Sequence, residues 1–197
     1  VVSDWDDQKE ISKNIKNFEI QDLLERKPII LNTDAISSKL NGKSILVTGA
    51  AGSIGSEIVR QVLHFSPKKI LLLDQAETPL HSLSLEILGL GLSVEVVNVI
   101  ADVRDYAILE RLFITYQPDV VYHAAAYKHV PMMEENPSQA IFTNVLGTKN
   151  VADLSNKYHV ERFVMISTDK AVNPSSIMGA SKRIAEMYVQ SKHFKHI

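Results

Sequence analysis

The chain lacks several features that would place it in other classes of protein. It contains no cysteine, which excludes disulfide bonds and thiolate metal sites, and His193 and His196 have no third ligand nearby, so no metal site is predicted. No apolar run approaches the roughly 18 residues that span a bilayer and no signal peptide is present, so we expect no membrane contact by the chain itself. The net charge of −2 and the pI of about 6.4 give no electrostatic footprint of a nucleic-acid partner.

What the sequence does contain suits one globular domain preceded by a polar segment. Of the 197 residues, 45% are hydrophobic and 22% are charged, which is enough for a sizeable core. Residues 1–43 are polar and weakly periodic, and we interpret them as a linker or approach segment with short helices at residues 20–26 and 34–40, the second capped by Asp34. The sequence begins at Val1 rather than at methionine, which indicates a segment of a longer protein.

From residue 44 onward, short apolar runs alternate with helical patterns. The strand-like runs cover residues 44–49, 69–74, 94–102, 119–126 and 162–168. In the first helical pattern, Ile54, Ile58 and Val62 recur every four residues beside Val59 and Leu63, as one apolar stripe. Runs that are apolar throughout indicate strands buried on both faces, so residues 44–197 are predicted to form an α/β domain with a doubly wound parallel sheet of the Rossmann type.

A glycine-rich turn between the first strand and the first helix is the strongest single motif. Gly49, Gly52 and Gly55 stand where a dinucleotide-binding turn needs backbone conformations and close approaches that a Cβ would block. The helix that follows offers free N–H groups to a pyrophosphate. Together with Thr48, Ser53 and Ile54, these glycines form the predicted cofactor loop.

Acidic residues end the second and third strands and are candidates for contacts with the adenosine half of a dinucleotide. Asp74, followed by Gln75, can accept hydrogen bonds from a ribose 2′-hydroxyl and would repel a 2′-phosphate, which favours NAD over NADP; the alternative is a plain strand-end cap. Asp102, followed by Val103, caps the next helix, accepts the adenine amino group, or does both.

Two further predictions concern the end of the fourth strand. Ala124, Ala125 and Ala126 are small, as expected where backbone passes close to a cofactor, although tight packing of a helix on the strand explains them nearly as well. Asn144, in the next helical pattern, either braces the backbone at the strand end or packs within its helix.

Three motifs together carry a resemblance to a known family: "TGAAGSIGSE" at 48–57, "HAAAYKHVPMMEENP" at 123–137 and "STDKAVNPSSIMGASKRIAEMYVQ" at 167–190. From about Leu23 to its end, the chain resembles the extended short-chain dehydrogenases/reductases, and within them the membrane-anchored nucleotide-sugar 4,6-dehydratases of bacterial capsule, O-antigen and protein-glycan synthesis. The resemblance implies NAD as cofactor, a UDP-sugar such as UDP-N-acetylglucosamine as substrate, and a homo-oligomer. It also implies a cytoplasmic domain whose parent protein is anchored in the bacterial inner membrane.

The resemblance assigns roles within the last motif. Many members of the broad family keep a tyrosine four residues before the lysine that orients the nicotinamide ribose; here Met178 precedes Lys182, and a thioether neither gives nor takes a proton. The similar dehydratases place additional proton chemistry at the end of the fifth strand. By that correspondence Thr168 contacts the sugar O4, Asp169 is the acid and Lys170 is the base, so Met178 is a family variant rather than the mark of a dead site.

By the same resemblance, the reaction comprises oxidation at C4 of the sugar, elimination of water across C5 and C6, and return of hydride to C6. Lys170 takes the C5 proton, and Asp169 protonates the leaving hydroxyl and assists at O4. Lys128 and Pro131 correspond to positions where related enzymes contact the substrate, whereas His129 is interpreted as structural. Asn173 either touches the sugar or caps the turn before the last helix.

Other interpretations remain open. The family fold has further strands and a smaller C-terminal lobe, so the five strands predicted here supply the cofactor half, and the predicted activity belongs to the longer protein. A nucleotide-sugar 4-epimerase of the same fold, a catalytically silent NAD-binding scaffold, and an interaction module that acts through residues 1–43 are the alternatives. A silent domain has no need of the four residues of the predicted site: Thr168, Asp169, Lys170 and Lys182.

Overall fold

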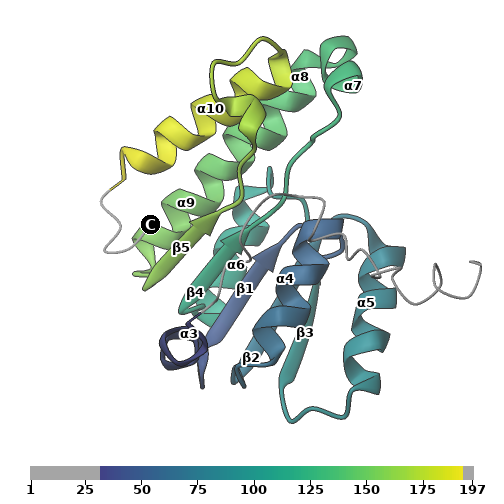
Figure 1. Ribbon diagram of the computed structural model, residues 1–197, viewed down its shortest axis with the longest axis vertical. Coiled ribbons are helices and arrows are strands. Elements are labelled where there is room, and N and C mark those ends of the chain that lie inside the picture. Colours follow the sequence, from purple (N-terminus) through teal and green to yellow (C-terminus); the bar gives the residue numbers. More distant parts are fainter. Residues whose placement is uncertain (1–31, 193–197) are drawn as a thin grey trace, which may run out of the picture. The chain divides into compact units, whose positions relative to one another are not determined.

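The computed structural model describes residues 32–192, which contain a single five-stranded sheet flanked by helices (Figure 1). The strands are β1 (Ser44–Thr48), β2 (Lys69–Asp74), β3 (Glu95–Ile100), β4 (Val120–His123) and β5 (Arg162–Met165). They follow the order β3-β2-β1-β4-β5, and each neighbouring pair is parallel. The order runs outward from β1 in both directions, which confirms the predicted doubly wound parallel sheet.

The helices connect these strands in the alternation that the sequence predicts. They are α3 (Thr33–Leu40), α4 (Ser53–Leu63), α5 (Glu77–Gly89), α6 (Tyr106–Tyr116), α7 (Val130–Glu135), α8 (Pro137–Ala140), α9 (Thr148–Lys157) and α10 (Ile177–Gln190), with a π-helix η1 (Ile141–Gly147) and a 3₁₀ turn η2 (Asp169–Ala171). No helix within residues 32–192 is both long and apolar enough to cross a membrane.

Most of the predicted approach segment, including the helix expected at residues 20–26, lies outside the described residues, as do His193 and His196. The chain divides into two compact units, and all described residues after Thr33 belong to the second. The second short helix is present as α3, but it begins at Thr33, so Asp34 lies in its first turn and is not the N-cap. Leu40 at its end is buried in the domain core.

The strands are buried on both faces because alternate side chains enter different clusters. In β1, Ile45 and Val47 join a cluster with α4 and α5, whereas Leu46 between them joins a second cluster with α6, α9 and α10. Figure 1 shows α4 and α5 on one side of the sheet. A continuous apolar run in sequence therefore corresponds here to a strand covered on both faces.

One member of the predicted apolar stripe on α4 is not a core residue. Val59, Val62 and Leu63 are buried and Ile58 packs against them, but Ile54 is 53% exposed. Ile54 lies in the first turn of α4, past the carboxyl end of the sheet, where it lines a cavity instead.

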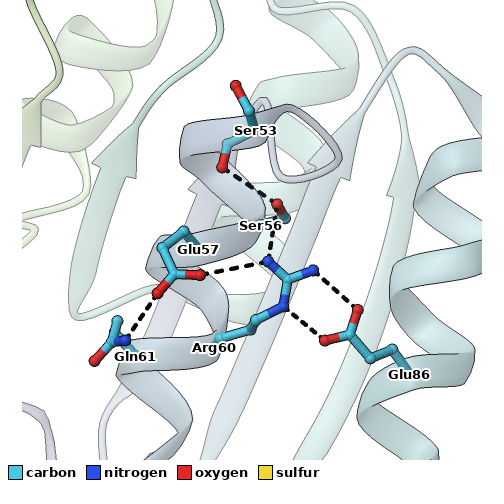
Figure 2. Close-up of polar contacts among 6 residues, drawn as sticks. All are labelled: Ser53, Ser56, Glu57, Arg60, Gln61 and Glu86. Atoms are coloured by element: carbon cyan, nitrogen blue, oxygen red, sulfur yellow. Dashed lines mark hydrogen bonds and ion pairs between the residues drawn. The ribbon is translucent and has the colours of Figure 1, made fainter. Parts of the chain in front are cut away.

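Helices α4 and α5 are joined on their outer surface by one arginine (Figure 2). Arg60 donates from Nε and Nη2 to the two carboxylate oxygens of Glu86 over 2.6 and 2.9 Å, and it also reaches Ser56 and Glu57 within its own helix. The side chains are 40% and 44% exposed, so solvent screens this pair and it adds little to stability. Its bidentate geometry links the two helices that follow β1 and β2.

Candidate active site

The glycine-rich turn after β1 packs against the chain that leaves β4. Gly49 has a φ of +66°, and a Cβ there would lie 2.6 Å from the backbone nitrogen of Ala125. A Cβ on Gly55 would collide with the carbonyl oxygen of Gly49, while Gly52 is the N-cap of α4. The turn therefore requires glycine at Gly49 and Gly55, and the backbone of Ala124 and Ala125 lies against Gly49.

A cavity of about 250 Å³ lies at the carboxyl ends of β1, β2, β3 and β4. It brings together nine of the predicted cofactor residues: Gly49, Gly52, Asp74, Gln75, Asp102, Val103, Ala124, Ala125 and Ala126. Tyr127, Thr143 and Pro79 also line it and were missed from the sequence, because nothing in their local pattern marks them. Thr48 is fully buried below this cavity and is not among its lining residues.

Asp74 is both a strand-end brace and a wall of the cavity. One carboxylate oxygen accepts from the backbone N–H of Ala51 over 2.9 Å, and the other accepts from that of Ala76 over 3.0 Å. The carboxylate thus ties the glycine-rich turn to the start of α5. An ionised carboxylate has about four acceptor sites, so it keeps capacity for a ribose hydroxyl.

Asp102 does not cap the following helix, so that alternative is wrong. Helix α6 is capped by Asp105, whose side chain accepts from the backbone N–H of Ile108 over 3.1 Å. Asp102 instead binds Arg104, accepting from its backbone N–H over 2.9 Å and from Nε over 2.7 Å. Burial raises the pKa of Asp102, but the hydrogen bonds from Arg104 outweigh it and hold that pKa below its ordinary value.

A second cavity, of about 390 Å³, collects residues from four distant parts of the chain. Its lining includes Ile54, Ala124, Ala126, Lys128, His129, Thr168, Lys170, Met178 and Lys182. The first turn of α4, the segment after β4, the end of β5 and one face of α10 thus meet there. This is the crevice at the carboxyl edge of a parallel sheet where ligands of such folds bind.

Lys182 is almost fully buried beside this second cavity. Its Nζ donates to the carbonyl oxygen of Ile166 over 2.7 Å, directly after β5. Burial lowers its pKa to about 8, and the carboxylate of Glu186 only partly offsets that effect. Lys182 is therefore a buried amine with a fixed position and a pKa near neutrality.

Thr168, Asp169 and Lys170 form a turn at the rim of the second cavity. The Thr168 hydroxyl donates to Asp169 over 2.9 Å, and the Lys170 ammonium lies 3.7 Å from the same carboxylate. The hydroxyl of Thr168 and the charge of Lys170 hold the pKa of Asp169 below its usual range. The Asp169 side chain is 90% exposed and does not line the cavity, whereas Thr168 and Lys170 do.

Met178 is a packing residue in the described part of the chain. Its side chain is buried in a small cluster with Met133 and Ala140, which Tyr127 and Ile177 extend. The thioether also lines the second cavity. Nothing about this position suggests proton transfer, as expected from its chemistry.

The remaining predicted contacts divide into two groups. Lys128 donates to the Ser53 hydroxyl over 3.3 Å, so its ammonium stands at the N-terminus of α4, and His129 lines the second cavity rather than the core. Pro131 lies in the first turn of α7, and neither it nor Asn173 lines either of the two cavities. Asn173 adopts a left-handed conformation with φ of +49°.

Asn144 braces the backbone after β4, which is the first of the two roles predicted for it. Its Oδ1 accepts from the backbone N–H of Tyr127 over 2.8 Å, and its Nδ2 donates to the carbonyl of Tyr127 and to the hydroxyl of Ser181. The side chain is fully buried and lines neither cavity, so its contacts are with the backbone of Tyr127 and the hydroxyl of Ser181. Asn144 lies in the π-helix η1, and π-helical turns are frequently found at functional sites.

His123, at the end of β4, was not among the residues predicted from the sequence. This residue is completely buried and hydrogen-bonded through both ring nitrogens, to Thr48 and to Thr148. A histidine ending an otherwise apolar strand was the available signal. Among residues 32–192, no group of three or more acidic, histidine or cysteine side chains could hold a metal ion.

Comparisons with known proteins show which proteins the chain resembles. A family model described as polysaccharide biosynthesis protein matches residues 45–196. The chain is 54% identical over 179 residues to the capsular polysaccharide biosynthesis protein CapD of Staphylococcus aureus, covering 90% of this chain and 30% of CapD. It is 39% identical over 144 residues to a UDP-N-acetylglucosamine 4,6-dehydratase (inverting) of Campylobacter jejuni, covering 72% of this chain and 41% of that protein.

Two further matches are a relative with a different activity and a solved structure. A UDP-glucose 4-epimerase of Rickettsia canadensis is 33% identical over 154 residues, covering 76% of this chain and 43% of the epimerase. The crystal structure of the Bordetella bronchiseptica enzyme WbmG in complex with NAD matches with a TM-score of 0.68 and 25% identity, covering 79% of this chain and 52% of that one. The chain therefore spans about half or less of the length of these relatives.

Proposed function

The chain belongs to the polysaccharide biosynthesis protein family, and from that membership we propose that it is the cofactor-binding part of an NAD-dependent UDP-N-acetylhexosamine 4,6-dehydratase. The observation that carries the proposal is the second cavity, where Thr168, Lys170 and Lys182 converge. A 4-epimerase needs no group to eliminate water, so a threonine–aspartate–lysine turn at this rim favours the dehydratase.

The described residues fit a dinucleotide across both cavities. The tight turn at Gly49 and the free N–H groups at the start of α4 suit a pyrophosphate, and Lys128 adds a positive charge at the same point. Asp74 would accept a ribose hydroxyl and Asp102 would border the adenine. Bound NAD would take up hydride from the sugar and later return it.

The residues of this chain would move the protons of the reaction. Lys182 would hold the nicotinamide ribose with its buried amine, while Lys170 would remove the C5 proton of the oxidised sugar. The Thr168 hydroxyl, which donates to Asp169 over 2.9 Å, would accept the proton of the C4 hydroxyl during its oxidation and pass its own proton to that carboxylate. Lys182, Lys170 and Thr168 border one cavity, which supports their action on a single ligand.

Asp169 would serve as the acid only after a change in its surroundings. A carboxylate must bind a proton before it can give one, and here a hydroxyl and an ammonium group hold its pKa low. Loss of solvent around a carboxyl group raises its pKa. We expect the substrate, together with the sequence that the longer relatives possess, to cover this exposed side chain and supply that shift.

The direct test is incubation of the full-length protein with UDP-N-acetylglucosamine, followed by mass analysis of the product. A dehydratase yields a 4-keto-6-deoxy sugar that is lighter by one water. A product of unchanged mass with altered stereochemistry would favour the 4-epimerase instead. Bound NAD without turnover of any nucleotide sugar would favour a silent scaffold.

Two properties of the whole protein are also proposals. The family resemblance supports an anchor in the bacterial inner membrane, with this domain on the cytoplasmic side, and a homo-oligomer. Cell fractionation tests the first, since an anchored protein leaves the membrane fraction only with detergent. Light scattering after size-exclusion chromatography tests the second.

A further inference from the structure

His123 joins the predicted cofactor loop to the helices behind the sheet. It lies at the end of β4 with no exposed surface. Its Nδ1 is 2.7 Å from the hydroxyl of Thr48, and its Nε2 is 2.9 Å from the hydroxyl of Thr148. Burial and the charge of Lys182 lower the pKa of His123 to about 3, so the ring is neutral at physiological pH.

The hydrogen bonds around His123 determine which nitrogen carries the proton. The hydroxyl of Thr148 donates its only proton to the carbonyl oxygen of Asn144 over 2.6 Å. It must then accept from His123, so Nε2 is protonated and Nδ1 is not. The unprotonated Nδ1 in turn accepts a hydrogen bond from Thr48.

His123 lies between the glycine-rich turn and the segment that holds Lys182. Thr48, its direct partner across β1 and β4, immediately precedes Gly49 of the cofactor loop. The carbonyl oxygen of His123 accepts from the backbone N–H of Ile166 over 3.0 Å, and the carbonyl of Ile166 holds Lys182. His123 thus contacts Thr48, which precedes the glycine-rich turn, through its ring. Through its backbone it contacts Ile166, which accepts the hydrogen bond from Lys182.

We propose that His123 is a positioning residue that holds the glycine-rich turn in the conformation that binds NAD. The inference rests on the proposed function, because it takes NAD as the ligand. The turn tolerates little displacement, since the backbone of Ala125 already lies against Gly49. Without an acceptor at Nδ1, the buried hydroxyl of Thr48 would be left unpaired and would seek another partner, which moves the residue next to Gly49.

Two substitutions of His123 distinguish the hydrogen bond at Nδ1 from the hydrogen bond at Nε2. Asparagine can present an acceptor near the place of Nδ1, whereas glutamine can present a donor near the place of Nε2. His123→Asn should therefore keep the contact to Thr48, and His123→Gln should lose it. Thr48→Val removes the same contact from the other side while keeping the side-chain volume.

The measurement is NAD affinity by calorimetry in the full-length protein. We expect His123→Gln and Thr48→Val to bind NAD about fivefold or more weakly, the effect of about one lost hydrogen bond, and His123→Asn to stay within about twofold. Val121→Ala on the same strand is the matched control. It lowers stability through a core cavity but should leave NAD affinity unchanged, so a general loss of stability is distinguished from displacement of the turn.

A second readout does not depend on the cofactor. Histidine labelled with ¹⁵N should give one resonance pair, absent in His123→Asn, with a protonated Nε2 and an unprotonated Nδ1 between about pH 5 and 8. The opposite tautomer would overturn the inference, and so would equal NAD affinity in all the His123 and Thr48 variants. A wild-type protein that binds no NAD would overturn the proposed function itself and this inference with it.

Discussion

Gly179 lies in α10, where the helix touches the turn that carries the proposed acid and base. A Cβ at Gly179 would lie well inside van der Waals distance of the backbone oxygen of Lys170, and 3.2 Å from both Pro174 Cβ and Ser176 Oγ. Overpacking of this kind costs about 1–3 kcal/mol, and the better helix propensity of alanine returns about 1 kcal/mol. We therefore expect Gly179→Ala to destabilise the protein by no more than about 2 kcal/mol.

The effect on activity should be much larger, because the turn is the part that can move. Helix α10 is held by its buried face, whereas the side chains of Asp169 and Lys170 are exposed. A displacement of about 1 Å in a reacting group can cost about 100-fold in rate. Gly179→Ala in the full-length protein should accordingly lower kcat about 100-fold while NAD still binds.

Gly89 provides a matched control for this substitution. It is the last residue of α5, and a Cβ there would meet nothing within 4 Å. Gly89→Ala should raise the free energy of unfolding by up to about 1 kcal/mol and leave kcat unchanged. Denaturant unfolding and steady-state turnover measure the two quantities, and a wild-type kcat in Gly179→Ala would refute the reasoning.

Four further predictions follow from the site. NAD should bind at least about tenfold more tightly than NADP, and Asp74→Ser should reduce this difference in affinity. Equal affinities for NAD and NADP in a titration of the wild type would contradict the role of the Asp74 carboxylate. Met178→Leu should keep most activity because its volume and polarity barely change, and a loss of several orders of magnitude with NAD binding intact would mean that this position has been misread. Lys170→Met should slow elimination about 10²–10⁴-fold and abolish exchange of the C5 hydrogen with deuterated solvent, so exchange at the wild-type rate would exclude Lys170 as the base. Burial lowers the folded-state pKa of Lys182 from 10.5 to about 8. The free energy of unfolding of the wild type should therefore rise by about 3 kcal/mol relative to that of Lys182→Met as the pH increases from about 8 to 10.5. An unchanged difference between the two proteins across that pH range would contradict this prediction.

Local pattern was sufficient to predict the sheet and the cofactor loop. The five apolar runs became five parallel strands, since a strand covered on both faces must be apolar throughout. Gly49 and Gly55 were recognisable because the requirement for a missing Cβ acts on the residue itself. The clustering of Asp74 and Asp102 at one edge followed from strand direction alone, as the carboxyl ends of parallel strands share an edge.

Two positions differ from their predicted roles because local spacing does not show what packs against a residue. Asp102 could have capped a helix from its spacing, but Asp105 does so and Arg104 claims Asp102. Ile54 fits an apolar stripe by period, yet its turn of α4 extends past the sheet and has no core to enter. Period and spacing describe a helix in isolation, whereas burial depends on what packs against it.

The sequence by itself determined the class of fold, the type of ligand and the residues able to do proton chemistry, because each depends on residue type and near-neighbour order. Only the tertiary structure decided which of those residues meet. Thr48 and His123 are separated by 75 positions in the chain and become hydrogen-bonded partners through the register of β1 with β4. The low pKa of His123 likewise comes from burial and from the charge of Lys182, and the reduced pKa of Lys182 comes from burial. Desolvation and distance are properties of the assembled core, so no local pattern contains them.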